Sequence, residues 1–78
     1  MSQGYSMSLV YANKKADNKH RGVALGRYCI QNQIPVSEVA VAFKVSRTAV
    51  YNWFCGASHP DRVHSEQIER FIARRRKK

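Results

Sequence analysis

The stretch from Val39 to Phe54, VAVAFKVSRTAVYNWF, is the most apolar part of this sequence and the one that most constrains its fold. Its first half alternates valine with alanine, and valine favours β-strands. The alternation stops after Lys44, and Ser46 then has the properties of a helix cap. The stretch is therefore either a strand followed by a turn or two short helices.

Helical spacing uses these apolar residues better than alternation does. A helix over 36–43 places four of them on one face and leaves Val41 outside it: Val36, Val39, Ala40 and Phe43. From a cap at Ser46, a second helix brings together Ala49, Val50, Trp53 and Phe54. Gly56 is well placed to end that helix. The stretch is thus predicted to be two helices joined by a tight turn.

Further helices are predicted on both sides of this pair. Asp17 or Asn18 caps a helix running through KHRGVALGRYCIQNQ, and Pro35 then breaks the chain because it disfavours helical geometry in the preceding residue. After the turn His59-Pro60-Asp61, a last helix presents an apolar face of Ile68, Phe71 and Ile72.

The N-terminal residues show a different pattern. Over 1–16, apolar side chains fall at alternate positions after a Gly/Ser-rich start, which predicts a flexible arm or an edge strand. The prediction is an all-α fold, a small bundle of about four helices. Its parts are the arm at 1–16, a helical domain at 17–73 and a basic tail at 74–78.

The charge of the chain indicates its class of partner. In 78 residues, 14 Lys and Arg oppose 5 Asp and Glu, which gives a formal net charge of +9. The apolar content of 44% excludes a wholly disordered chain, so the sequence describes one small, folded and strongly basic domain. Such a domain is expected to bind a polyanion.

Other functional classes have little support in the sequence. Cys29 and Cys55 are expected to be reduced thiols in a cytoplasmic protein, since we find neither a signal peptide nor an apolar run that could span a membrane. The spacing of Cys55, His59 and His64 lacks the paired cysteines of familiar zinc sites. We expect no metal, cofactor or small-molecule substrate, and no enzyme activity, because the few carboxylates form no catalytic constellation.

The helix pair resembles the helix-turn-helix of lambda-repressor-like (Cro/CI-type) DNA-binding domains, and the resemblance covers roughly residues 22–72. The positions that match its spacing of apolar and small residues are Val39, Ala40, Phe43, Val45, Val50, Trp53 and Gly56. Lys44 departs from the pattern, because it stands where the family usually has glycine. A left-handed lysine there costs about 1 kcal/mol or more.

The resemblance implies that 17–73 is a helix-turn-helix DNA-binding domain, with a recognition helix at about Ser46–Cys55 that enters the major groove of DNA. The residues expected to face the DNA are Lys44, Ser46, Arg47, Thr48, Tyr51 and Asn52. Arg47 suits guanine and Asn52 suits adenine, because each pairing forms two hydrogen bonds. Phosphate contacts are expected from the two basic clusters, specifically from Lys19, Arg21, Arg74 and Arg75.

The resemblance further implies a small transcriptional regulator of the phage or prophage type, a repressor, associated with the nucleoid of a bacterial or phage-infected cell. A single recognition helix reads few base pairs, so a homodimer is expected, through either the N-terminal apolar arm or the face of Ile68, Phe71 and Ile72. Two alternatives remain open. One is a protein-interaction module that binds polymerase or another protein through Val41 and Tyr51, and the other is nonspecific coating of nucleic acid by charge alone.

Overall fold

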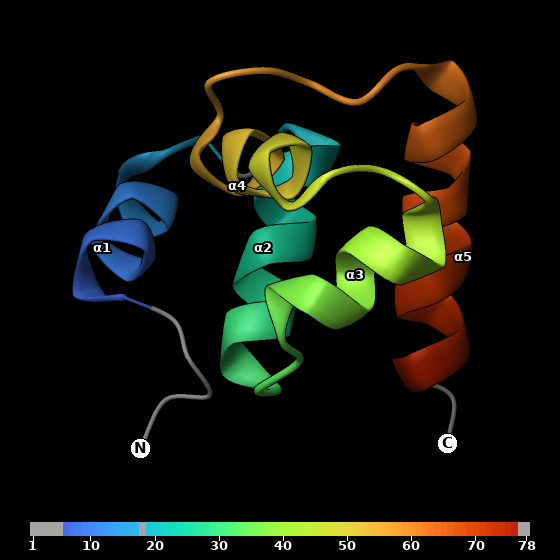
Figure 1. The fold of residues 1–78 in the computed structure, drawn as a ribbon, viewed down its shortest axis with the longest axis horizontal. Coiled ribbons are helices and arrows are strands. Elements are labelled where there is room, and N and C mark those ends of the chain that lie inside the picture. Colours follow the sequence, from blue (N-terminus) through green and yellow to red (C-terminus); the bar gives the residue numbers. More distant parts are fainter. Residues whose placement is uncertain (1–5, 18, 77–78) are drawn as a thin grey trace.

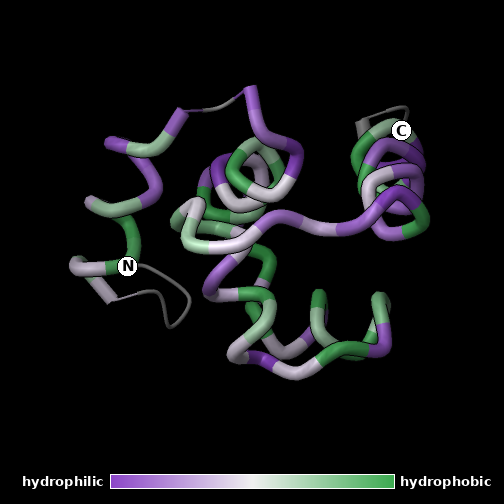
Figure 2. The backbone as a smooth tube through the Cα atoms, turned by 90° about the horizontal axis from the view of Figure 1, so that it is seen from above, coloured by the Kyte–Doolittle hydropathy of each residue, from purple (hydrophilic) through white to green (hydrophobic). Residues whose placement is uncertain are grey.

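The computed structural model describes residues 6–17 and 19–76, over which the chain forms five helices and no strand. The helices are α1 (Met7–Lys15), α2 (Arg21–Gln31), α3 (Val36–Phe43), α4 (Arg47–Cys55) and α5 (Arg62–Arg76). Figure 1 shows α2 in the middle, with α1 on one side, α5 on the other and α3 and α4 in front. Seen from above, α1 and α5 again lie on opposite sides, and hydrophilic residues run along the connection into α5 (Figure 2). The predicted all-α fold is confirmed.

The predicted N-terminal arm or edge strand is wrong for the described part of 1–16, because residues 7–15 form helix α1, and the helices number five rather than about four. The hydroxyl oxygen of Ser6 caps α1 by accepting from the N–H of Leu9 at 3.1 Å. Leu9 and Val10 pack against the core and Asn13 is buried, a helical spacing that the alternating pattern concealed.

Helix α2 begins later than the sequence predicts. Its first residue is Arg21, and Asp17 instead closes a turn, accepting from the N–H of Lys19 through its carboxylate and from the N–H of His20 through its carbonyl. Asn18, the alternative cap, lies outside the described residues, as do residues 1–5 of the predicted arm and 77–78 of the predicted tail. The described part of that tail continues α5 as helix.

Helices α2, α3 and α4 end in the same backbone geometry. Gln33, Lys44 and Gly56 follow them in the left-handed region, with φ of 58°, 58° and 81°. In each case the next N–H donates to the carbonyl five residues earlier: Ile34 to Cys29, Val45 to Ala40 and Ala57 to Asn52. These are Schellman endings, which satisfy carbonyls that the helix leaves unpaired. Glycine is confirmed as the end of α4, and the domain tolerates lysine at the end of α3 at a cost of roughly 1–2 kcal/mol.

Two glycines let α2 cross α4 closely. A Cβ atom at Gly22 would lie 2.9 Å from the carbonyl oxygen of Trp53, and one at Gly26 would lie 2.7 Å from Cγ of Phe54. The two glycines are four residues apart, so they share a face of α2. No larger residue fits this crossing without a shift of α4, which fixes the position of that helix in the fold.

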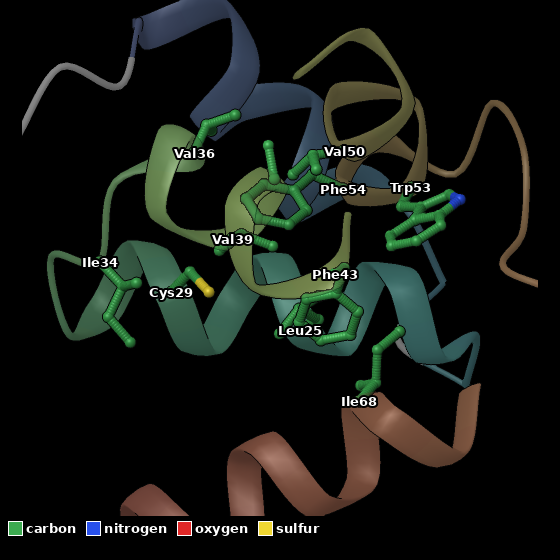
Figure 3. Close-up of a cluster of buried hydrophobic side chains, with 11 residues drawn as sticks. Leu25, Cys29, Ile34, Val36, Val39, Phe43, Val50, Trp53, Phe54 and Ile68 are labelled. Atoms are coloured by element: carbon green, nitrogen blue, oxygen red, sulfur yellow. The ribbon is translucent and has the colours of Figure 1, made fainter. Parts of the chain in front are cut away.

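The core fills the space between α2, α3, α4 and α5. Val50, Trp53 and Phe54 are buried as predicted, while Ala49 is half-buried and Val41 is 78% exposed on the outer side of α3. Figure 3 shows the side chains of the core converging from these helices. The cluster consists of Leu25, Cys29, Ile34, Val36, Val39, Ala40, Phe43, Val50, Trp53, Phe54 and Ile68.

Candidate nucleic-acid interface

The three-residue connection between α3 and α4 sets the direction in which α4 leaves the core. Lys44 turns the chain in the left-handed conformation, with φ 58° and ψ 43°, and Val45 packs against the core beneath it. The hydroxyl oxygen of Ser46 then accepts from the N–H of Ala49 at 3.1 Å and starts α4. Because the core holds both helices, the outer face of α4 is a fixed surface.

The six residues predicted to contact DNA lie together along this connection and the outer side of α4. Lys44, Ser46, Arg47 and Thr48 are exposed, and Tyr51 is 44% exposed. Asn52 differs from the expectation that it faces solvent, because it is half-buried. Its carbonyl oxygen also accepts hydrogen bonds from the N–H groups of residues 57 and 58, which stabilise the C-terminal end of α4.

A shallow groove runs between the outer side of α3 and the start of α4. Lys44, Ser46 and Arg47 border it on one side, and α3 contributes the other wall. The complete lining is Ser37, Ala40, Val41, Lys44, Val45, Ser46 and Arg47. Ser37 was not predicted to belong to the site, although it lies one helical turn before Val41, which the helical spacing leaves on the outer side of α3.

The lining of this groove carries the positive charges of Lys44 and Arg47. Between Glu38 and Asp61 the sequence contains no acidic residue, while Lys44 and Arg47 both fall in that interval. The described residues that line the groove include no carboxylate. The groove therefore suits an anionic partner that approaches from the side of α3 and α4.

The four predicted phosphate contacts do not form one surface. Arg21 pairs with Glu69 and so links α2 to α5. Arg75 pairs with Glu38 of α3, and its guanidinium lies 4.5 Å from the ring centre of Phe71. Lys19 and Arg74 are exposed. Two of the four cations thus have acidic partners that a phosphate would have to replace.

Two titratable groups have shifted pKa values. Burial raises the pKa of the Cys29 thiol to about 12, so this side chain behaves as a small apolar core residue. At the start of α5, the Asp61 carboxylate accepts from the backbone N–H of His64 at 2.9 Å, and the His64 ring lies 2.9 Å away. These hydrogen bonds lower the pKa of Asp61. Both groups lie outside the groove.

Comparison with models of protein families, with curated proteins and with solved structures finds no match to this chain. Within residues 6–17 and 19–76, no three His, Cys, Asp or Glu side chains gather in a way that could hold a metal ion. No helix in the same ranges is long and apolar enough to cross a membrane.

The position of α1 on the other side of α4 was not predicted from the sequence. There Ser6, Ser8, Leu9 and Ala12 of the N-terminal segment line a second groove with Tyr51 and Cys55. The signal that could have found it is the cap at Ser6 followed by Leu9, Val10 and Asn13 at helical spacing. The candidate site on α4 and the N-terminal helix α1 are therefore adjacent.

Proposed function

We propose that this protein binds duplex DNA in a sequence-specific manner, as a small transcriptional regulator that acts as a repressor. In this proposal α3 and α4 form a helix-turn-helix, and α4 enters the major groove. The observation that carries it is the division of α4 into two sides. Val50, Trp53 and Phe54 are buried, while Arg47, Thr48 and Tyr51 are exposed beside an electropositive groove.

The residues of α4 have separate roles in the proposal. Arg47 is the first candidate for reading a base, because its exposed guanidinium can donate two hydrogen bonds to guanine. Lys44 contacts a phosphate, and Thr48 and Tyr51 contact bases or backbone. Ser46 has a structural role as the cap of α4, and its hydroxyl can still donate to a phosphate oxygen. Asn52 contributes less than expected since it is half-buried.

A homodimer on a two-fold symmetric site belongs to the same proposal, because a nine-residue helix spans few base pairs. Of the two dimer surfaces expected from the sequence, the apolar face of α5 is already covered by the core of its own chain. Ile68 is buried, and Phe71 and Ile72 pack against the core of their own chain. Met7 on α1, which is 79% exposed, lies on the remaining candidate surface.

Selection of bound duplexes from a random pool tests the proposal most directly. We expect an enriched motif with two-fold symmetry. Arg47→Ala should then weaken binding to the selected duplex by about 1–3 kcal/mol and binding to random duplex much less. Arg62→Ala removes an exposed arginine outside the groove and serves as the matched control.

Two results would contradict the proposal in different ways. Binding to random duplex without any enriched motif would indicate coating by charge alone. No binding to duplex even at low salt would favour the protein-interaction module, for which the 78% exposure of Val41 and the 44% exposure of Tyr51 are the supporting observations.

A further inference from the structure

Helix α4 lies between two grooves, and the proposed function uses only one of them. The second groove separates α4 from α1 and is lined by Ser6, Ser8, Leu9, Ala12, Tyr51 and Cys55. Tyr51 belongs both to this lining and to the exposed side of α4. The α1 side of the second groove is therefore continuous with the surface proposed to face DNA.

Polar contacts hold α1 firmly beside α4. The buried Asn13 donates through Nδ2 to the carbonyl oxygens of Val23 at 3.1 Å and of Phe54 at 2.7 Å. Arg27 of α2 donates to the carbonyl oxygen of Asn13 at 2.9 Å and to that of Lys14 at 3.3 Å. Since these hydrogen bonds reach both α2 and α4, α1 keeps a fixed position next to α4.

At 100° per residue the exposed residues of α1 span one continuous arc of about 120°, from Lys14 and Met7 at one edge, through Tyr11, to Lys15 and Ser8 at the other. Ser8, Tyr11 and Lys15 are spaced i, i+3 and i+7, so they share one side of the helix, and Ser8 borders the groove with α4. The ammonium group of Lys15 lies 5.1 Å from the ring centre of Tyr11. Lys14 points about 100° away around the helix and lines a different groove, between α1 and α2.

The dimensions of DNA suit a helix in this position. The major groove is about 12 Å wide, and packed helices lie roughly 8–10 Å apart. When α4 occupies the groove, a helix that packs beside α4, and not behind it on the core side, lies over a sugar–phosphate backbone. Helix α1 contains no acidic residue and carries lysines in its last turn, so its charge is complementary to phosphate.

We propose that α1 is a second DNA-contacting element, in which Ser8, Tyr11 and Lys15 bind the sugar–phosphate backbone of the duplex that α4 reads. This inference rests on the proposed function. Lys15 neutralises a phosphate, and the hydroxyls of Ser8 and Tyr11 donate to phosphate oxygens. The contacts add affinity and fix the orientation of α4, and they carry no sequence preference.

The two adjacent lysines provide a matched pair for the test. Binding of the full chain to a selected and to a random duplex is measured over a range of salt concentrations for Lys15→Ala and Lys14→Ala. We expect Lys15→Ala to weaken binding to both duplexes by a similar factor and to lower the salt slope by about 0.9. Lys14→Ala should leave the slope unchanged. Tyr11→Phe, which keeps the ring and removes the hydroxyl, should weaken binding to both duplexes without changing the melting temperature.

Equal effects of the two lysine variants would overturn the inference, because they would show a general charge effect. A loss of dimerisation in Lys15→Ala or Tyr11→Phe, measured by sedimentation without DNA, would also overturn it and assign this side of α1 to a second copy of the chain. If the wild-type chain binds no duplex, the proposed function fails as well. If Arg47→Ala relaxes specificity while Lys15→Ala behaves like Lys14→Ala, only the role of α1 is wrong.

Discussion

Replacement of Gly26 by alanine has two opposite effects on the free energy of unfolding. Alanine is the better helix former, and in the middle of a helix this exchange alone stabilises by about 1 kcal/mol. In this fold, however, the new Cβ would lie 2.7 Å from Nδ2 of Asn13 and 2.7 Å from Cγ of Phe54. Both neighbours are buried, and Asn13 is held by its two hydrogen bonds, so neither side chain can move away easily.

The packing effect should exceed the gain in helix propensity. Overpacking of a close contact costs about 1–3 kcal/mol, and a weakened Asn13 hydrogen bond adds about 1 kcal/mol. After subtraction of the propensity gain, Gly26→Ala should lower the free energy of unfolding by about 1–3 kcal/mol. For a domain of this length, each kcal/mol shifts Tm by about 4–8 °C, so a drop on the order of 5–20 °C is expected.

Thermal and urea unfolding followed by circular dichroism measure this loss. Ala24→Gly, on the half-buried side of α2, measures the propensity difference in the same helix. In the background of Asn13→Ala, Gly26→Ala should cost less, because one of the two closest neighbours is gone. If Gly26→Ala instead raises Tm by as much as Ala24→Gly lowers it, α2 and α4 do not approach as closely as described.

Three further predictions concern other parts of the fold. Lys44→Gly should raise the free energy of unfolding by up to about 1 kcal/mol, because glycine adopts the left-handed conformation without the steric cost of roughly 1–2 kcal/mol that lysine bears and loses part of that gain as chain entropy. The same variant should weaken DNA binding, and a lower stability in chemical unfolding would contradict the prediction. The pKa of Asp61 is lowered from 3.8 by hydrogen bonds from His64, so its contribution to stability is complete above that value and is lost as pH falls through the lowered pKa. Accordingly, Asp61→Ala should be less stable than the wild type near neutral pH, and the difference should vanish in acid melts. Burial raises the pKa of Cys29 to about 12, so a thiol reagent at pH 8 should modify Cys55 in the native protein and Cys29 only after unfolding.

The helices that build the centre of the fold were predictable because their periodicity and their end signals agree. The spacing of Val39 and Phe43, the cap at Ser46 and the glycine after α4 all indicate the observed helices. Val41 was also correctly left outside the apolar face. At these positions, local propensity and tertiary packing favour the same structure.

The N-terminal helix could not be predicted in the same way, because its docking depends on partners far along the chain. The amide of Asn13 reaches a carbonyl of α4 across 41 residues of sequence, and a polar residue gives no hydrophobic pattern to detect. The pairing of Arg21 with Glu69 and of Arg75 with Glu38 is equally nonlocal. The sequence shows that these arginines are basic, but it does not show that the fold places a carboxylate beside each of them.

The hydrogen bond between Asn13 and the carbonyl of Phe54 also limits how early, during synthesis of the chain, α1 can complete its docking. A chain grows from its N-terminus at about 5–20 residues per second, so the 41 residues that separate the two partners take about 2–8 s to add. During that interval α1 can dock only on α2, through Asn13 and Arg27, and a nine-residue helix alone is marginally stable in water. The docking of α1 is therefore complete only after α4 has been made, and the groove between these two helices cannot form earlier.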